Sequence, residues 1–160
     1  MTQRCGFCAI KVGRGLEVDP HEPENVAKVT TDLGLKHVVV TSVARDDLAD
    51  EGSIQFAETI RAIRSENPLT IIEVLTPDFK GKRWCIQNVT DAKPDIYNHN
   101  IETVRRIQPK VRIKGDYDRA LWILKRAKEL WAEHFPDREP LLTKSGIIVG
   151  MGETDDEVVE

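Results

Sequence analysis

The chain of 160 residues has few cysteines, few aromatic residues and no excess of basic residues. Its three cysteines, an odd number, argue against a disulfide framework and are typical of a reducing compartment. No apolar run is long enough to span a membrane, and no apolar core after a charged start marks a signal peptide. The net charge of −4 gives no reason to expect nucleic acid or an anionic membrane as a partner. We therefore expect a cytoplasmic protein that binds neither.

The hydrophobic content of 40% is sufficient for one globular domain with a buried core. Apolar runs predict strands over residues 37–42, 70–75, 95–100 and 143–149, the first of them β-branched and typical of a strand covered on both faces. Helical spacing predicts helices over 23–33 and 81–91, and a helical start at Asp155, Asp156 and Glu157. Two further helices carry Ile54, Ala57, Ile60 and Ile63, and then Leu121, Leu124, Ala127 and Trp131 after a cap at Tyr117 and Asp118. This alternation predicts βαβ units and a parallel sheet, the α/β class.

Each predicted strand ends in polar residues or glycine. These ends are Thr41 and Ser42, residues 76–78, residues 98–100 and residues 150–152. Ligands of parallel α/β folds bind at the carboxyl ends of the strands, so the four ends indicate one binding face. A purely structural role for these residues remains open, because hydroxyls also cap loops and a glycine pair can be a simple turn.

Asn98, Asn100 and Glu102 alternate along one strand end and can therefore face the same side. Two amides and a carboxylate suit the hydroxyls of a ribose. We expect His99, which lies between the asparagines, to be a hydrogen-bonded structural residue rather than a metal ligand.

Cys5 and Cys8 are separated by two residues, a spacing suited to a soft metal centre. Two thiolates do not complete an iron–sulfur or zinc site, which ordinarily takes three or four ligands. Cys85, beside Trp84, is remote in sequence, and we interpret it as structural.

Several stretches in one order resemble the lipoyl synthase family of radical S-adenosylmethionine enzymes. They are residues 1–8, 41–43, 45–48, 73–79, 98–104, 144–146 and 150–153. The resemblance implies a partial (βα)6 TIM-type barrel whose first and last strands are missing from this chain, so that residues 1–160 form an incomplete radical S-adenosylmethionine core domain. It also implies a [4Fe-4S] cluster on three cysteines, two of which match Cys5 and Cys8, with Met1 in the place of the first.

The same resemblance implies sulfur insertion at carbons 6 and 8 of an octanoyl group on a lipoyl carrier domain or H protein. It implies an electron donor such as ferredoxin or flavodoxin, and an auxiliary cluster whose ligands are absent here. S-adenosylmethionine would contact residues that match the family's pattern: Thr41, Ser42, Asn98, Asn100, Glu102, Lys144, Gly150 and Gly152.

Met1 at a cysteine position leads us to expect a misassigned start or a truncated gene, and weak cluster binding by this chain. A targeting segment lost upstream would make a mitochondrial or plastid location compatible with the sequence. Two alternatives stay open. One is a sulfur-inserting relative of biotin synthase, and the other is a non-catalytic metal-binding module completed by a partner's ligands.

Overall fold

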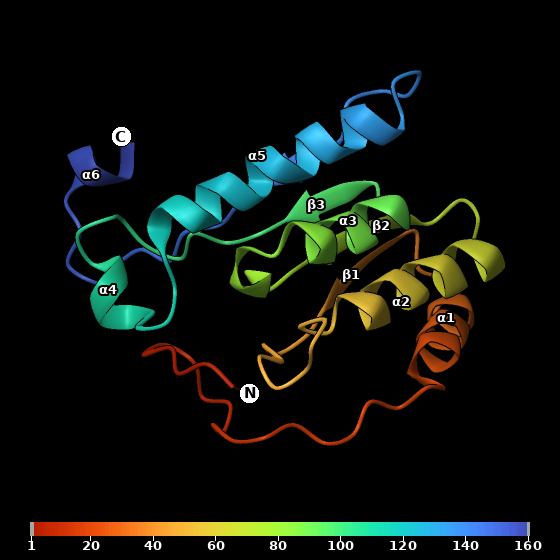
Figure 1. Cartoon of the computed structure of the whole chain (residues 1–160), viewed down its shortest axis with the longest axis horizontal. Helices are drawn as coiled ribbons and strands as arrows, with labels where there is room; N and C mark the ends of the chain where they lie inside the picture. The colour runs from red at the N-terminus through yellow and green to blue at the C-terminus, as the bar shows by residue number, and fades with distance from the viewer. Residues whose placement is uncertain (1, 160) are drawn as a thin grey trace.

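Four parallel strands form the centre of the computed structural model, which describes residues 2–159 (Figure 1). They are β1 (His37–Thr41), β2 (Ile71–Leu75), β3 (Ile96–Asn98) and β4 (Leu142–Lys144), and they pair in chain order. Each connection therefore returns the chain to the same end of the sheet, as βαβ units do. The predicted α/β class with a parallel sheet is confirmed.

Helices connect the strands and cover the outer face of the sheet (Figure 1). The main helices are α1 (Glu22–Asp32), α2 (Ser53–Glu66), α3 (Arg83–Asp91) and α5 (Tyr117–His134), which match the four predictions within a few residues. The short elements are the 3₁₀ turn η1 (Phe79–Gly81), α4 (Gln108–Val111) and α6 (Asp155–Val159). A helix of four residues such as α4 is too short to show periodicity in a sequence. No helix within residues 2–159 is long and apolar enough to cross a bilayer.

The core lies between the outer face of the sheet and the helices. Ile72, Val74 and Tyr97 of the strands are inaccessible to solvent, as are Ile60 of α2 and Ile123 of α5. Alternate strand residues point to this face, while the intervening residues point to the opposite, inner face. The helices thus fix which strand residues remain available for a binding site.

Two residues that the predicted helical stripes place in the core are exposed instead. Ile54 is 53% exposed and Leu121 is 45% exposed, although Ala57, Ile60 and Ala127 are buried as predicted. The reason is geometric, because successive steps of three residues each fall about 60° short of a full helical turn. Ile54 therefore lies far around α2 from the residues at the other end of the stripe, and Phe56 takes the core position instead.

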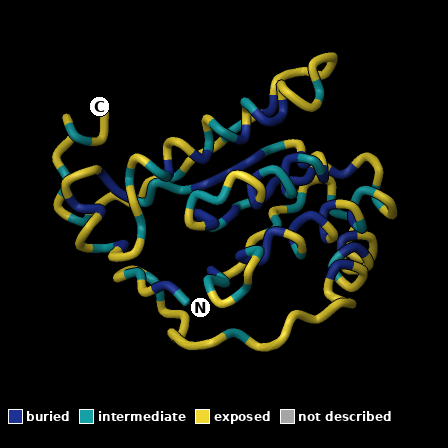
Figure 2. The backbone as a smooth tube through the Cα atoms, viewed as in Figure 1, coloured by how far each residue is buried: buried dark blue, intermediate teal, exposed yellow. Residues whose placement is uncertain are grey.

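The inner face of the sheet is open, which corrects the expectation that the first strand is covered on both faces. Val38 and Val40 point to the helices, but Val39 on the inner face is 51% exposed. β1 and β4 are the two edges of the sheet. The largely exposed segment of residues 9–19 runs along the outside of the molecule to α1 (Figure 2).

Two boundaries also differ from the prediction. Of the expected strand over 143–149, only Thr143 and Lys144 join the sheet, as part of β4 (Leu142–Lys144). The following backbone bonds instead to the loop after β3, where Glu102 N–H donates to Gly146 O at 3.1 Å. Helix α5 is capped by Asp116, whose carboxylate accepts from the Arg119 N–H at 2.7 Å, rather than by Tyr117 or Asp118.

Candidate active site

A tight turn brings Cys5 and Cys8 together. The Cys8 N–H donates to the Cys5 carbonyl at 3.1 Å, and the Gly6 N–H donates to the Val111 carbonyl at 2.6 Å. Cys5 and Arg112 also form an isolated antiparallel bridge. The residues that end α4 thus hold the backbone of the cysteine turn, although they lie about a hundred residues further along the chain.

Both thiols are half-buried and free of disulfides. Burial raises the pKa of Cys5 above its ordinary value, and the positive charge of Arg112 only partly opposes this. A metal ion would therefore have to displace a proton from this sulfur when it binds. No group of three His, Cys, Asp or Glu side chains within residues 2–159 is arranged to hold a metal ion, and Met1 lies outside the described residues.

The cysteine turn opens onto a pocket of about 200 Å³ at the carboxyl ends of β1 and β2. Five of the predicted site residues line it together, namely Cys5, Cys8, Thr41, Ser42 and Glu102. The Thr41 hydroxyl donates to the Leu75 carbonyl at 3.0 Å, and the Ser42 hydroxyl donates to the Val43 carbonyl at 3.1 Å. The lone pairs of both hydroxyl oxygens remain available to accept hydrogen bonds from a ligand.

Glu102 closes the pocket from the side of β4. Its backbone has a positive φ of 70°, and its carbonyl accepts from the Ile148 N–H at 2.7 Å. Burial raises the pKa of Glu102, although the charge of Arg112 and a hydrogen bond from Asn100 act in the opposite direction. A cationic group in the pocket would favour the ionised carboxylate, because an opposite charge nearby offsets the cost of burial.

Asn98 and Lys144 do not line this pocket. They belong to a polar cluster on the inner face, in which Glu73 Oε1 accepts from Asn98 Nδ2 at 3.0 Å and from Lys144 Nζ at 2.9 Å. His37 Nε2 lies 3.3 Å from Glu73 Oε2. Asn98 Oδ1 is buried and has no hydrogen-bond partner within the described chain, so it is available as an acceptor.

The predicted glycine turn is present but exposed and outside the pocket. Gly150 and Gly152 both have a φ of 99°, a conformation that glycine adopts without strain. The N–H groups of Gly150 and Met151 donate to the carboxylate of Glu153, and Arg106 donates to the Gly152 carbonyl at 2.9 Å. The turn is thus held by its own charged residues. Asn100 is likewise outside the pocket, although its side chain lies against Gly146, where a Cβ would meet Asn100 Oδ1 at 2.7 Å.

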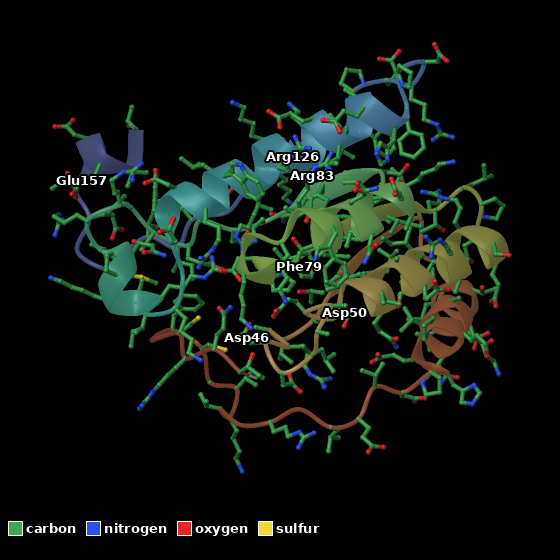
Figure 3. All side chains as sticks on the ribbon, viewed as in Figure 1. Asp46, Asp50, Phe79, Arg83, Arg126 and Glu157 are labelled. Atoms are coloured by element: carbon green, nitrogen blue, oxygen red, sulfur yellow. The ribbon has the colours of Figure 1, made fainter. Side chains whose placement is uncertain are left out.

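Arg112 has no signal in the sequence, whereas Asp78 belongs to the predicted polar strand end at residues 76–78 but has contacts that the sequence does not reveal. Arg112 is 8% exposed, lines the pocket and donates from Nη1 to the Asn100 carbonyl at 3.0 Å. Asp78 is 2% exposed and accepts from Gln3 Nε2 at 3.2 Å and from Arg119 Nε at 3.0 Å. Gln3 also donates to Asp46, whose side chain lies beside the N-terminal segment (Figure 3). These contacts join residues far apart in the chain, which spacing alone cannot reveal.

A second pocket of about 450 Å³ lies on the outer side of β1, between α1 and α2. Thr41 and Ser42 border it as well, but no cysteine does. The thiols therefore distinguish the smaller pocket as the candidate active site.

Comparison with known proteins shows the family to which the chain belongs. The sequence model of the radical SAM superfamily matches residues 2–160. The lipoyl synthase of Shouchella clausii is 52% identical over 159 residues, which are 99% of this chain and 49% of that protein. The lipoyl synthase of Symbiobacterium thermophilum is 54% identical over 159 residues, 99% of this chain and 48% of that protein. The chain spans about half the length of these relatives.

Two solved structures share the fold. Methylornithine synthase (PylB) superposes with a TM-score of 0.71 over 98% of this chain and 44% of that one, at 15% identity. The FeFe-hydrogenase maturase HydG from Carboxydothermus hydrogenoformans superposes with a TM-score of 0.70 over 94% of this chain and 34% of that one, at 18% identity. The partial barrel predicted from the family resemblance is confirmed. The chain belongs to the radical SAM superfamily.

Proposed function

We propose that residues 1–160 form the radical SAM core of a lipoyl synthase. The reaction is the insertion of sulfur at carbons 6 and 8 of an octanoyl group carried by a lipoyl domain or H protein. The observation that carries the proposal is the pocket in which Cys5 and Cys8 meet Thr41, Ser42 and Glu102, in a chain about half identical to lipoyl synthases.

Cys5 and Cys8 would hold iron, because thiolates are the preferred ligands of iron–sulfur clusters and the two lie on one turn beside the pocket. They supply two of the ligands that such a cluster takes. When bound, the cluster supplies the electron that cleaves the sulfonium bond of S-adenosylmethionine. The auxiliary cluster of the family has no ligands assigned among the described residues.

The other pocket residues bind and orient the nucleotide. The carboxylate of Glu102 suits the amino group of the methionyl part, and the guanidinium of Arg112 suits its carboxylate. Thr41 and Ser42 offer acceptor oxygens at the strand ends. Asn98 and Lys144 lie on the inner face of the sheet outside the pocket, and the amides of Asn98 and Asn100 suit ribose hydroxyls. A Cβ at Gly150 or Gly152 would meet no atom within 4 Å, so this turn has room for the adenine.

Anaerobic reconstitution with iron and sulfide tests the cluster. We expect a weak, broad visible absorption in the wild-type chain, because only two cysteines are present, and the loss of this absorption in Cys8→Ser. The matched control is Cys85→Ala, because Cys85 is also a free thiol but lies in the core with its sulfur 3.3 Å from the Asp50 carbonyl. Retention of zinc without this absorption would instead favour the metal-binding module.

Position 1 gives a second test. Met1→Cys, produced behind a cleavable tag, is expected to raise the iron content per chain, because a thiolate binds iron better than a thioether does. With dithionite as the reductant, this variant is also expected to cleave S-adenosylmethionine. Equal iron content in Met1→Cys and the wild type would contradict the assignment of residues 1–8 as the cluster loop.

A further inference from the structure

The buried carboxylate of Asp78 joins three segments that are far apart in the chain. Asp78 is 2% exposed, and its Oδ1 accepts from Gln3 Nε2 at 3.2 Å and from the Lys80 N–H at 3.1 Å. Its Oδ2 accepts from Arg119 Nε at 3.0 Å and lies 2.9 Å from Arg119 Nη2. A carboxylate is costly to bury unless its oxygens are paired, so these contacts fix the N-terminal segment against η1 and the start of α5.

The N-terminal segment reaches this carboxylate through Gln3, two residues before Cys5. Gln3 is 5% exposed, lines the pocket and also donates to Asp46 Oδ1 at 3.4 Å. The hydroxyl of the preceding Thr2 donates to the Ala44 carbonyl at 3.0 Å and accepts from the Asp46 N–H at 2.8 Å. Residues 2 and 3 are therefore held between the loops that follow β1 and β2, and the cysteine turn continues from this fixed point.

A second connection to the same segment runs through Arg119. Its Nη2 also donates to the Lys114 carbonyl at 2.9 Å, and Lys114 Nζ donates to the Thr2 carbonyl at 3.0 Å. These hydrogen bonds complete a ring that runs from Asp78 through Arg119, Lys114 and Thr2 to Gln3. The position of Asp78 thus bears on both residues that precede the cysteine turn.

The backbone that follows Asp78 adopts a conformation that is rare for residues with a side chain. Phe79 and Lys80 have positive φ values of 45° and 50°. Phe79 is 1% exposed and lies edge-on to Phe56, with 6.1 Å between the ring centroids, while Lys80 Nζ donates to the 2% exposed Glu51 at 3.1 Å. Strained backbone persists only where surrounding contacts impose it, and it is concentrated at functional sites. Core packing and a buried carboxylate thus hold Asp78 where it meets the N-terminal segment.

We propose that Asp78 is a positioning residue that acts through Gln3 to hold the cysteine turn at the pocket. Gln3 is among the residues that line the pocket and Asp78 is not, so the effect of Asp78 on a ligand there is indirect. The turn is set in place before a ligand binds, and binding does not have to order it. This inference rests on the proposed function for the identity of the ligand, but the position of the turn is a property of the chain alone.

Amide hydrogen exchange of Gly6, followed by NMR in the reduced, metal-free chain, tests the proposal. The Gly6 N–H donates to the Val111 carbonyl, and this bond requires the docked turn. Gln3→Ala is expected to raise the exchange rate of Gly6 on the order of tenfold, because hydrogen bonds to charged groups are lost. The amides of β2 and β3 should exchange as in the wild type, because only the turn is released.

Two further variants of Gln3 separate hydrogen bonding from packing. Gln3→Glu keeps the shape of the side chain but places a carboxylate beside Asp78 and Asp46, so Gly6 should exchange at least as fast as in Gln3→Ala. Gln3→Lys keeps an N–H donor toward both carboxylates and should restore most of the protection of Gly6.

The matched control is Gln55→Ala. The Gln55 amide likewise donates to a carboxylate, that of Glu22 at 3.0 Å, and also to the Asp19 carbonyl at 2.9 Å. Because this contact joins α1 to α2, its loss should change the exchange rate of Gly6 by less than about twofold.

Asp78→Asn tests the carboxylate itself. Its single amide oxygen would accept from the guanidinium of Arg119, so Gln3 loses its acceptor and Gly6 should exchange as fast as in Gln3→Ala. If circular dichroism shows that Asp78→Asn does not fold, the three variants of Gln3 still decide, because Gln3 is not a member of the hydrophobic core.

Four outcomes overturn the proposal: unchanged exchange of Gly6 in Gln3→Ala, wild-type exchange in Gln3→Glu, wild-type exchange in a folded Asp78→Asn, or an equal rise at the amides of β2 and β3. Failure to bind iron or S-adenosylmethionine would count against the proposed function alone, because the exchange is measured without either.

Discussion

His99 is a histidine held neutral inside the protein. It is 1% exposed, and its Nδ1 lies 2.9 Å from the Thr76 carbonyl, so this nitrogen carries the proton. Burial, followed by the positive charge of Arg112, lowers the pKa of His99 to about 4. The expected hydrogen bond of His99 is confirmed, and its Nε2 is buried without a partner within the described residues.

This histidine makes the stability of the fold depend on pH. Its pKa is lower in the folded state than in the unfolded chain, so the unfolded chain takes up a proton first as the pH falls. Stability is therefore present above about pH 6.5 and is lost toward pH 4. We expect a loss of about 2 kcal/mol in the free energy of unfolding between about pH 7 and about pH 5 from this residue, measured by urea denaturation. His99→Asn keeps an N–H donor but has no group that titrates in this range, so its free energy of unfolding should fall by about 2 kcal/mol less over the same change of pH. An identical pH dependence in both chains would refute the prediction.

Glu73 is a buried carboxylate on the inner face of the sheet. Burial alone would raise the pKa of Glu73, but hydrogen bonds from Lys144 and Asn98 outweigh it and hold this pKa below its ordinary value. Glu73 is thus ionised at neutral pH and orients the amide of Asn98, so that its free oxygen is fixed in place.

A double-mutant cycle of Glu73→Gln and Lys144→Met measures this ion pair. We expect a coupling energy of about 1 kcal/mol in the free energy of unfolding, because the carboxylate is buried while the 56% exposed lysine is screened by water. The matched pair of Glu58 and Arg61 on α2, in which both side chains are about half exposed, should give less than about 0.5 kcal/mol. Equal coupling in the two pairs would mean that burial of Glu73 has no effect.

At the scale of the element, the Asp116 side chain fixes where α5, the longest helix of the described residues, begins. The Asp116 carboxylate accepts from the Arg119 N–H at 2.7 Å, and so satisfies a backbone donor that the helix leaves unpaired. Asp116→Ala is expected to lower the free energy of unfolding by about 1 kcal/mol in denaturant titrations. Asp116→Asn retains the cap and should cost less than about 0.5 kcal/mol. If Asp116→Asn lowered the free energy of unfolding more than Asp116→Ala does, Asp116 would not be the residue that caps α5.

At the scale of the whole molecule, the open inner face exposes apolar surface. Ile71 is 45% exposed and Leu142 is 65% exposed, and both point away from the helices. Ile71→Lys/Leu142→Lys is expected to reduce binding of an apolar fluorescent dye and self-association in sedimentation velocity. Leu69→Lys is the control, because Leu69 is 94% exposed but lies in the loop before β2. A larger effect of the control would show that the inner face is already covered.

Local patterns in the sequence were sufficient for the order of helices and strands and for the α/β class. The β-branched run at residues 37–42 and the proline-bounded helices predict their elements because these preferences act over a few residues. The same patterns were insufficient for the ends of β4 and α5, where contacts with the loop after β3 and the Asp116 cap decide the boundary.

The sequence by itself determined the candidate ligands, because Cys5, Cys8, Thr41, Ser42 and Glu102 are recognisable by residue type, spacing and position at strand ends. Only the tertiary structure decided which of them share a pocket, and that Asn98 and Lys144 instead surround Glu73. It also decided the place of Arg112, whose segment pairs with the cysteine turn. The physical reason is that spacing along the chain reports neighbours within an element, whereas a pocket is made by strand ends and loops that meet only when the sheet forms.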